Sequence, residues 1–276
     1  MALSTLKGTV YGAACGDALG VPYEFKKRGT FYCNGIMTGY GTHNQPAGTW
    51  SDDTSMMIAT CDSIRRTHTV DVNDILLRFK NWFSNKEYAC GGSVFDYGLT
   101  TAAAILQGKG QSTLSDNGNG SLMRIAPLAY IDWSEACVSN VSAITHAHKI
   151  SKDVCVEYVR LLRDFIEGNT TREMLIKIFP DIANAAPSQI RSGGFVKDTM
   201  TAALWCFMTT NNYKDCVVKA VNLGDDTDTT AAVAGALAGT YYGYDDIPKS
   251  WINALRDKEI IDRCLFNPGE WLNENN

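Results

Sequence analysis

The sequence lacks the features of a secreted, membrane-spanning or nucleic-acid-binding protein. Its first residues, M-A-L-S-T-L-K-G, do not have the layout of a signal peptide, and no apolar run approaches the roughly 20 residues of a spanning helix. The 25 Lys and Arg residues do not outnumber the 30 Asp and Glu residues. The resulting net charge of −5 predicts no broad nucleic-acid binding, although local N–H groups or a metal can still bind a small anion.

The cysteines lack any paired spacing. There are nine, an odd number, scattered along the chain without a C-x-x-C, and most of them stand in apolar helical patterns. This distribution is typical of reduced, buried thiols in a cytoplasmic protein. We therefore expect a cytoplasmic location, and neither a zinc site nor a catalytic cysteine.

Linkers and alternating strand patterns are also scarce. No Pro/Ser-rich stretch or composition shift divides the 276 residues, which predicts a single domain over residues 1–276. Apolar residues recur at helical spacing, so we predict an all-α protein, a compact orthogonal multi-helix bundle. Residues 25–49, rich in Gly, Tyr and Asn, are expected to form a long functional loop. The predicted helices cover residues 4–20, 52–66, 71–83, 97–107, 117–129, 134–148, 151–167, 170–179, 198–208, 215–222, 228–242, 248–256 and 259–266.

Two acidic clusters, S-D-D-T at 51–54 and D-D-T-D-T-T at 225–230, each precede an apolar helical stretch. Helix capping and the helix dipole account for one or two of these carboxylates, but each cluster supplies more oxygen groups than a cap needs. Crowded aspartates repel one another unless a cation lies between them, and oxygen-only ligands suit Mg²⁺ or Mn²⁺. If the clusters meet in space, they would hold one metal or a pair. A metal-dependent hydrolase is therefore the first hypothesis.

Two further polar segments are compatible with ligand binding. The turn G-N-G-S at 118–121 would offer the exposed amides of a helix N-terminus to a phosphate, although a plain helix-entry loop is the commoner reason for such glycines. His146 and His148 stand two residues apart. On a helix they would point to different faces, which makes them a poor metal pair.

Five segments together resemble one known family. They are G-x-x-x-G-D-A-L-G-x-P-Y-E at 12–24, G-T-W-S-D-D-T-S-M at 48–56, N-G-N-G-S-L-M-R at 117–124, T-H-A-H at 145–148 and G-D-D-T-D-T-T-A-A-V-A-G at 224–235. The stretch S-G-G-F-V-K-D-T-M-T-A-A-L-W-C-F at 192–207 is similar too. With these segments in order, nearly the whole chain resembles the ADP-ribosylglycohydrolase family, of the dinitrogen-reductase-activating glycohydrolase type.

The resemblance implies an all-α fold with a binuclear centre of two Mg²⁺ (or Mn²⁺) ions. The metal ligands that it implies are Ser51, Asp52, Asp53, Asp226, Asp228 and Thr229. The predicted catalytic carboxylates are Glu24, Asp53 and Asp226, with Glu24 favoured as the acid or base. The substrate-binding residues would be Gly118, Asn119, Gly120 and Ser121 at the diphosphate or ribose, His146 near the distal ribose and Phe195 on the adenosine side.

The chain departs from the family pattern in three places. Ser51 stands where the family often has Thr, which keeps the hydroxyl. Asp225 stands where the family often has Gly, so it either faces solvent or adds negative charge near the metals. Residues 115–117 offer no aromatic side chain to stack on adenine, as some members do there, so the grip on adenine is left open.

The implied reaction is hydrolysis of the glycosidic bond at C1″ of ADP-ribose on a modified protein or small molecule. Arginine-linked protein is favoured by family habit, but serine-linked, nucleic-acid-linked and small-molecule ADP-ribose present the same ribose. Residues 25–49 and 84–96, the latter with Tyr88, Phe95 and Asp96, are expected to discriminate between leaving groups. Two alternatives stay open: a catalytically silent ADP-ribose-binding relative, and a metal-dependent nucleotide phosphohydrolase.

Overall fold

The structure, a computed structural model, describes residues 2–270 and consists of α-helices joined by loops and 3-10 turns. Within those residues the β structure is limited to isolated bridges, so the predicted all-α fold is confirmed. The helices are α1 (Ala2–Gly20), α2 (Asp52–Thr67), α3 (Val72–Asn85), α4 (Leu99–Gln107), α5 (Glu135–Ala143), α6 (Lys149–Glu167), α7 (Arg172–Ile178), α8 (Pro180–Ala183), α9 (Val196–Met208), α10 (Tyr213–Val221), α11 (Thr227–Tyr242), α12 (Lys249–Ala254) and α13 (Lys258–Cys264).

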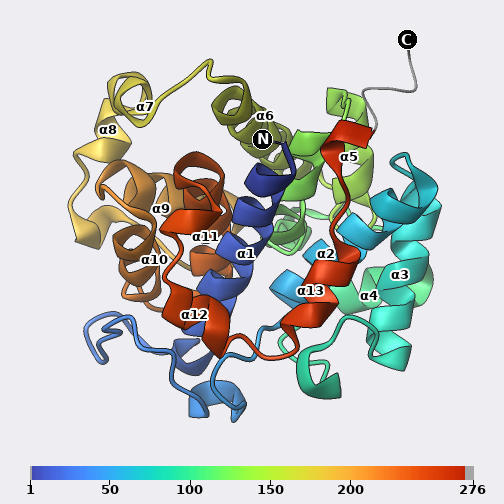
Figure 1. The fold of residues 1–276 in the computed structure, drawn as a ribbon, viewed down its shortest axis with the longest axis horizontal. Coiled ribbons are helices and arrows are strands. Elements are labelled where there is room, and N and C mark those ends of the chain that lie inside the picture. Colours follow the sequence, from blue (N-terminus) through green and yellow to red (C-terminus); the bar gives the residue numbers. More distant parts are fainter. Residues whose placement is uncertain (1, 271–276) are drawn as a thin grey trace.

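Helices α1 and α11 pack side by side in the middle of the molecule (Figure 1). A Cβ on Gly12 of α1 would stand 2.3 Å from the carbonyl oxygen of Gly235 in α11. A Cβ on Gly239 would likewise stand 2.2 Å from the carbonyl oxygen of Gly8. Only glycine lets two backbones approach this closely. Gly235 and Gly239, four residues apart on α11, therefore allow its close contact with α1.

This contact brings the two acidic clusters together, because α1 holds both of them. A Cβ on Gly20, the last residue of α1, would lie 2.4 Å from the Cα of Asp228 at the start of α11. Asp17 of α1 accepts hydrogen bonds from the backbone N–H of Ser51 at 2.9 Å and from the hydroxyl of Thr54 at 2.6 Å. The N-termini of α2 and α11 thus meet at one end of α1.

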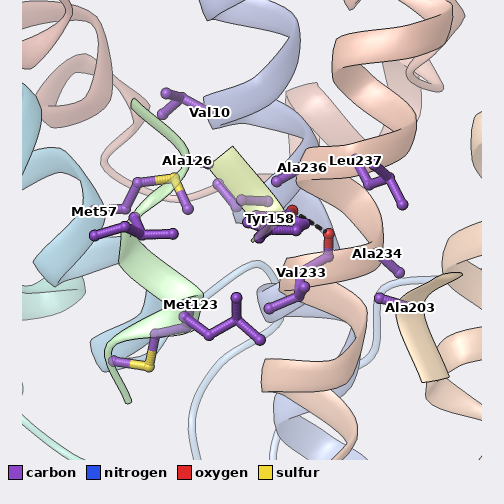
Figure 2. Close-up of a cluster of buried hydrophobic side chains, with 14 of the residues drawn as sticks. Val10, Met57, Met123, Ala126, Tyr158, Ala203, Val233, Ala234, Ala236 and Leu237 are labelled. Atoms are coloured by element: carbon purple, nitrogen blue, oxygen red, sulfur yellow. Dashed lines mark hydrogen bonds between the residues drawn. The ribbon is translucent and has the colours of Figure 1, made fainter. Parts of the chain in front are cut away.

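Apolar side chains from several helices fill the core around this pair (Figure 2). Val10 of α1, Met57 of α2 and Leu237 of α11 are buried there together. Tyr158 of α6 is buried among them, and its hydroxyl donates to the carbonyl oxygen of Val233 at 2.7 Å. The only polar atom of that side chain therefore has its hydrogen bond.

Two other sequence-level expectations can be checked against the fold. All nine cysteines are free; eight are buried and Cys137 is half-buried, as predicted for reduced thiols. Between residues 2 and 270, no helix combines the length and the apolar character that crossing a membrane requires.

The helix predicted over residues 117–129 is wrong. The segment forms two short 3-10 turns, Leu122–Arg124 and Ala126–Tyr130, after an irregular stretch. Pro127 has no N–H to donate and its ring crowds the preceding turn, so an α-helix cannot continue through it. The glycine turn therefore does not begin an α-helix.

The helix predicted over residues 134–148 ends early, at Ala143. The next residues leave the helix because the backbone of Ala147 donates to the carbonyl oxygen of Gln111, and Gln111 donates to that of Thr145. His146 therefore lies outside any α-helix, and His148 serves as the N-cap of α6. The remaining predicted helices begin and end within two residues of the observed bounds, and residues 25–49 contain only one 3-10 turn, at Gly41–His43.

Candidate metal and substrate site

The acidic residues occupy the N-terminal ends of α2 and α11. Ser51 caps α2, because its Oγ accepts the backbone N–H of Asp53 at 3.3 Å, as its position predicted. Asp226 occupies the corresponding position before α11. Asp52 and Asp53 thus lie in the first turn of one helix and Asp228 in the first turn of the other. The positive end of each helix dipole favours carboxylates at these positions.

Carboxylates from both helices converge into two groups that share one residue. Oxygens of Asp17, Asp53 and Asp228 lie within 4.8 Å of one another. A second group, also within 4.8 Å, joins Asp228 to Glu24, His43 and Asp96. The hydroxyl of Thr229 links the helices directly, because it donates to Oδ2 of Asp53 at 3.2 Å. Asp228 therefore lies between two adjacent sets of ligand atoms.

Three carboxylate oxygens of the site are buried without a hydrogen-bond donor among residues 2–270. They are Oδ1 of Asp53, Oδ1 of Asp226 and Oδ2 of Asp228. A buried polar atom without a partner is costly, and a carboxylate oxygen especially so. Hard divalent cations prefer such oxygens as ligands, so the residues present fit the binding of Mg²⁺ or Mn²⁺.

The raised pKa values of the carboxyl groups also favour a bound cation. Burial, together with the charges of neighbouring carboxylates, raises the pKa values of Asp52, Asp53 and Asp228 well above their usual range. Burial also raises the pKa of Asp17 and that of Asp226 to about 6, against the opposing effect of hydrogen bonds to each. A cation held between these groups would favour their charged forms and reverse the shifts.

Glu24, His43 and Asp96 form the second wall of the site. Nε2 of His43 contacts Oε2 of Glu24 and lies 3.4 Å from Oδ1 of Asp96. The ring of Phe95 packs 5.2 Å from that of His43, centroid to centroid. Burial, the charge of Asp52 and the charge of Glu24 raise the pKa of Asp96 to about 11.

One cavity of about 490 Å³ joins the acidic residues to the glycine turn. Its acidic lining residues are Glu24, Asp52, Asp96 and Asp226, and the lining also includes Gly118, Asn119, Gly120, His146 and Gly194. A ligand in this cavity would touch both the carboxylates and the turn.

The glycine turn is tied to the acidic cluster through Asn119. Its Nδ2 donates to Oδ2 of Asp226 at 2.8 Å, and its backbone N–H donates to the carbonyl oxygen of Gly194 at 2.9 Å. The prediction of an exposed amide is therefore wrong at Asn119. Glycine is needed at position 120 because a Cβ there would lie 2.8 Å from Cε1 of His146.

Two predicted substrate residues lie apart from the cavity lining. Ser121 is fully buried, and its Oγ accepts a hydrogen bond from Oγ of Ser142 at 3.0 Å. Phe195 is 40% exposed at the start of α9, next to the cavity residue Gly194. Their roles in substrate binding stay predictions.

Several site residues were missed or misplaced by the sequence interpretation. Asp17 had one signal, a carboxylate inside an otherwise small and apolar helix, whereas His43 had none in its polar loop. Asp96 was expected near the leaving group and does line the cavity. Tyr88 does not: it is buried, and its hydroxyl donates to Asp62 at 2.8 Å.

The extra carboxylate of Asp225 faces away from the site. Its side chain is exposed, and its φ of 60° lies in the left-handed region. Its backbone is held by Lys26 and Phe25, with N···O distances of 2.9 and 2.7 Å. Asp tolerates this conformation better than most residues and Gly adopts it freely, which explains why either can stand here.

Comparison with known proteins identifies the class. The family described as ADP-ribosylglycohydrolase matches residues 2–274 of the chain. The chain therefore belongs to the ADP-ribosylglycohydrolase family. It is 33% identical to the ADP-ribosylarginine hydrolase Tri1 of Pseudomonas putida (strain GB-1), over 95% of this chain and 77% of that protein. It is 32% identical to the ADP-ribosyl-[dinitrogen reductase] glycohydrolase of Rhodospirillum rubrum, over 90% of this chain and 89% of that protein. A solved structure described as an ADP-ribosylglycohydrolase-related protein complex aligns with a TM-score of 0.81 at 28% identity, covering 98% of both chains.

Proposed function

We propose that this protein is a metal-dependent hydrolase that cleaves the glycosidic bond at C1″ of ADP-ribose and so removes mono-ADP-ribose from a modified target. One observation carries the proposal. Buried carboxylate oxygens of Asp53, Asp226 and Asp228 have no donor in the described part of the chain, and Asp226 lines a cavity of about 490 Å³ that the glycine turn also lines. Cations complete such a set, whereas a purely structural cluster would supply its own donors.

The residues that would hold two Mg²⁺ or Mn²⁺ ions are Ser51, Asp52, Asp53, Asp226, Asp228 and Thr229. When bound, such ions supply positive charge that orients ribose hydroxyls and lowers the pKa of a water molecule. Asp17 has a supporting role, because its oxygens already accept two backbone N–H groups and a hydroxyl.

Glu24 is the residue that best suits proton transfer. In hydrolysis, the oxygen of water bonds to C1″, the bond from C1″ to the target breaks, and a carboxylate takes the water proton while the leaving group gains one. Oδ2 of Asp53 accepts two hydroxyls and Oδ2 of Asp226 accepts an amide, and these bonds hold both carboxylates in place, which supports a role as ligands more than one in proton transfer. Glu24 lines the cavity without such bonds to Ser, Thr or Asn side chains among the described residues.

The Glu24→Gln variant tests this role. We expect it to lose turnover by about 10² to 10⁴, the usual contribution of a general acid or base, while it still binds Mg²⁺ or Mn²⁺ in calorimetry. Near-normal turnover with metal bound would remove Glu24 from the reaction.

An arginine-linked target is the favoured substrate. Glu24 and Asp96 place two carboxyl groups on one wall of the cavity, where a guanidinium could pair with them. Phe25, which also lines the cavity, is 68% exposed and offers a ring face to the same cation. The name of the Tri1 relative, an ADP-ribosylarginine hydrolase, supports this choice.

The test is release of free ADP-ribose from arginine-ADP-ribosylated protein, with Mg²⁺ or Mn²⁺ and then with EDTA. We expect release that depends on the metal. Inorganic phosphate or a nucleotide as the product would identify a phosphohydrolase instead. No release from arginine-, serine- or nucleic-acid-linked substrates, despite metal binding in calorimetry, would identify a silent ADP-ribose-binding protein.

A further inference from the structure

Arg124 is a fully buried cation without a carboxylate partner among residues 2–270. Its guanidinium lies against the ring of Phe79 and donates instead to backbone carbonyls, those of Gly120 at 3.2 Å and Val141 at 3.3 Å. Its shortest bond runs from Nη2 to the hydroxyl of Thr145, at 2.8 Å. A buried guanidinium always donates, so the oxygen of Thr145 must accept this bond.

Among the described residues, the hydroxyl proton of Thr145 then has one available acceptor. Thr145 is fully buried, and the only other hydrogen-bond partner of its Oγ1 among the described residues is Nδ1 of His146, at 2.9 Å. A buried hydroxyl proton needs an acceptor, and since Arg124 can only donate, the proton of Thr145 points at Nδ1 of His146. A ring nitrogen that accepts a hydrogen bond carries no proton, so the neutral ring carries its proton on Nε2.

Nε2 of His146 faces the cavity at the glycine turn. It would lie 3.4 Å from a Cβ on either Gly118 or Gly120, so both glycines make room for the ring. Within residues 2–270 no hydrogen bond to Nε2 is formed, and His146 lines the cavity. Burial and the charge of Arg124 lower the pKa of His146 to about 3, which keeps the ring neutral.

We propose that Arg124 and Thr145 are positioning residues that fix His146 as a neutral Nε2–H donor aimed at the glycine turn, ready for an oxygen atom of the bound ligand. Only the identity of that ligand, ADP-ribose, rests on the proposed function. The ring proton is a property of the free protein and can be measured without substrate.

The first experiment reads the ring directly by long-range ¹H–¹⁵N NMR of the histidine-labelled protein at neutral pH. The chain has four histidines, and His146→Gln assigns the relevant signals. We expect a protonated Nε2 and an accepting Nδ1 in the wild type and in Thr145→Ser. In Thr145→Val, which keeps the shape and removes the hydroxyl, Nδ1 loses its donor and its signal shifts.

A proton on Nδ1 in the wild type, or His146 signals unchanged in Thr145→Val, would overturn the proposal. Thr145→Val leaves Nη2 of Arg124 without its partner, so its folding is checked by circular dichroism. If it does not fold, the wild-type and Thr145→Ser spectra still decide where the proton lies.

The second experiment measures ADP-ribose affinity by calorimetry in the same three proteins. We expect Thr145→Val to bind about ten-fold more weakly, the loss of about one well-placed hydrogen bond, and Thr145→Ser to bind like the wild type. Equal affinity in Thr145→Val would refute the positioning role. If the wild type binds no ADP-ribose but its ring carries the proton on Nε2, the tautomer assignment stands and the proposed function fails.

Discussion

Helix α2 has buried aspartates near both ends, and their surroundings are opposite in charge. Near its C-terminus, Asp62 is 2% exposed and accepts hydrogen bonds from Arg65, Arg66, Arg78 and the hydroxyl of Tyr88, at 2.6 to 3.0 Å. Burial acts to raise the pKa of Asp62, but the bonds from Arg65 and Tyr88 outweigh it and lower the pKa. This cluster is complete within the protein.

Among residues 2–270, the carboxylates at the N-terminus of α2 have no such cations beside them. No Lys or Arg forms an ion pair with Asp52, Asp53, Asp226 or Asp228 in the part of the chain that the structure describes. The pKa values of these carboxyls are raised, whereas that of Asp62 is lowered. Asp62 thus shows the surroundings of a structural aspartate in this protein: paired cations and a lowered pKa. The carboxylates at the N-terminus of α2 have neither, and a bound metal would supply the missing positive charge and lower their pKa values.

The largest expected loss of activity comes from removing the carboxylate of Asp228, which belongs to both groups of ligand atoms in the site. Asp228→Asn should lower metal-dependent release of ADP-ribose on the order of a thousand-fold, more than the 10- to 100-fold typical of outer-sphere changes. Calorimetry should show metal binding weakened in parallel. The neutral side chain also relieves repulsion among the buried carboxylates, so the metal-free variant should unfold at a temperature no lower than that of the wild type.

Asp225→Asn is the matched control, because Asp225 is an exposed neighbour in the same segment and Asn tolerates its left-handed backbone. We expect it to retain turnover and metal affinity. Equal losses in Asp225→Asn and Asp228→Asn would mean that overall charge, and not a defined ligand set, binds the metal.

The structural cluster should respond in the opposite way. Asp62→Asn removes a buried carboxylate and leaves the donors of Arg78, whose side chain is 11% exposed, and of buried Tyr88 partly unpaired. We expect a loss of about 3 kcal/mol in the free energy of unfolding, measured by urea denaturation, with turnover per folded molecule unchanged. Loss of turnover without loss of stability would show that the two ends of α2 are coupled.

The helices were largely predictable because their signals are local. Apolar spacing and the cap residue at its start define α2 to within one residue. The wrong helix over residues 117–129 also contains a local signal against it, because Pro127 interrupts an α-helix.

From spacing, the acidic clusters were predictable because they start helices, whereas the places of Glu24 and His146 in the site were implied only by the resemblance to the family. Asp53 and Asp228 stand in recognisable segments, but the meeting of those segments depends on α1 packing against α11. His43 comes from a short 3-10 turn and Asp96 from an irregular segment in which its φ is 67°, and neither position has a periodic signal in the sequence. The bond from Thr145 to His146 depends on a chain reversal after α5 that helical periodicity does not reveal.

Metal binding should stabilise the protein through the carboxylates at the N-termini of α2 and α11 and not through Asp62. Mg²⁺ or Mn²⁺ at about 100 times its dissociation constant should raise the free energy of unfolding by about 2.7 kcal/mol for each site filled. Urea titrations with metal and with EDTA should show the same gain in the wild type and in Asp62→Asn, and little gain in Asp228→Asn. An equal gain in all three proteins would place the metal elsewhere.

The smallest expected effect is a pH dependence of the stability that Asp62 contributes. The pKa of Asp62 is lower in the folded protein than in the unfolded chain, where it is about 3.9. Its ionisation therefore stabilises the fold fully above that value, and the contribution is lost as the pH falls through the folded pKa. In EDTA, the difference in unfolding free energy between the wild type and Asp62→Asn should stay constant from pH 7 to 5 and narrow as the pH falls below about 4 towards the folded pKa of Asp62. Urea unfolding at each pH measures this difference. A difference that does not change down to pH 3 would mean that the Arg65, Arg66 and Arg78 contacts stabilise the fold by packing and not through the charge of Asp62.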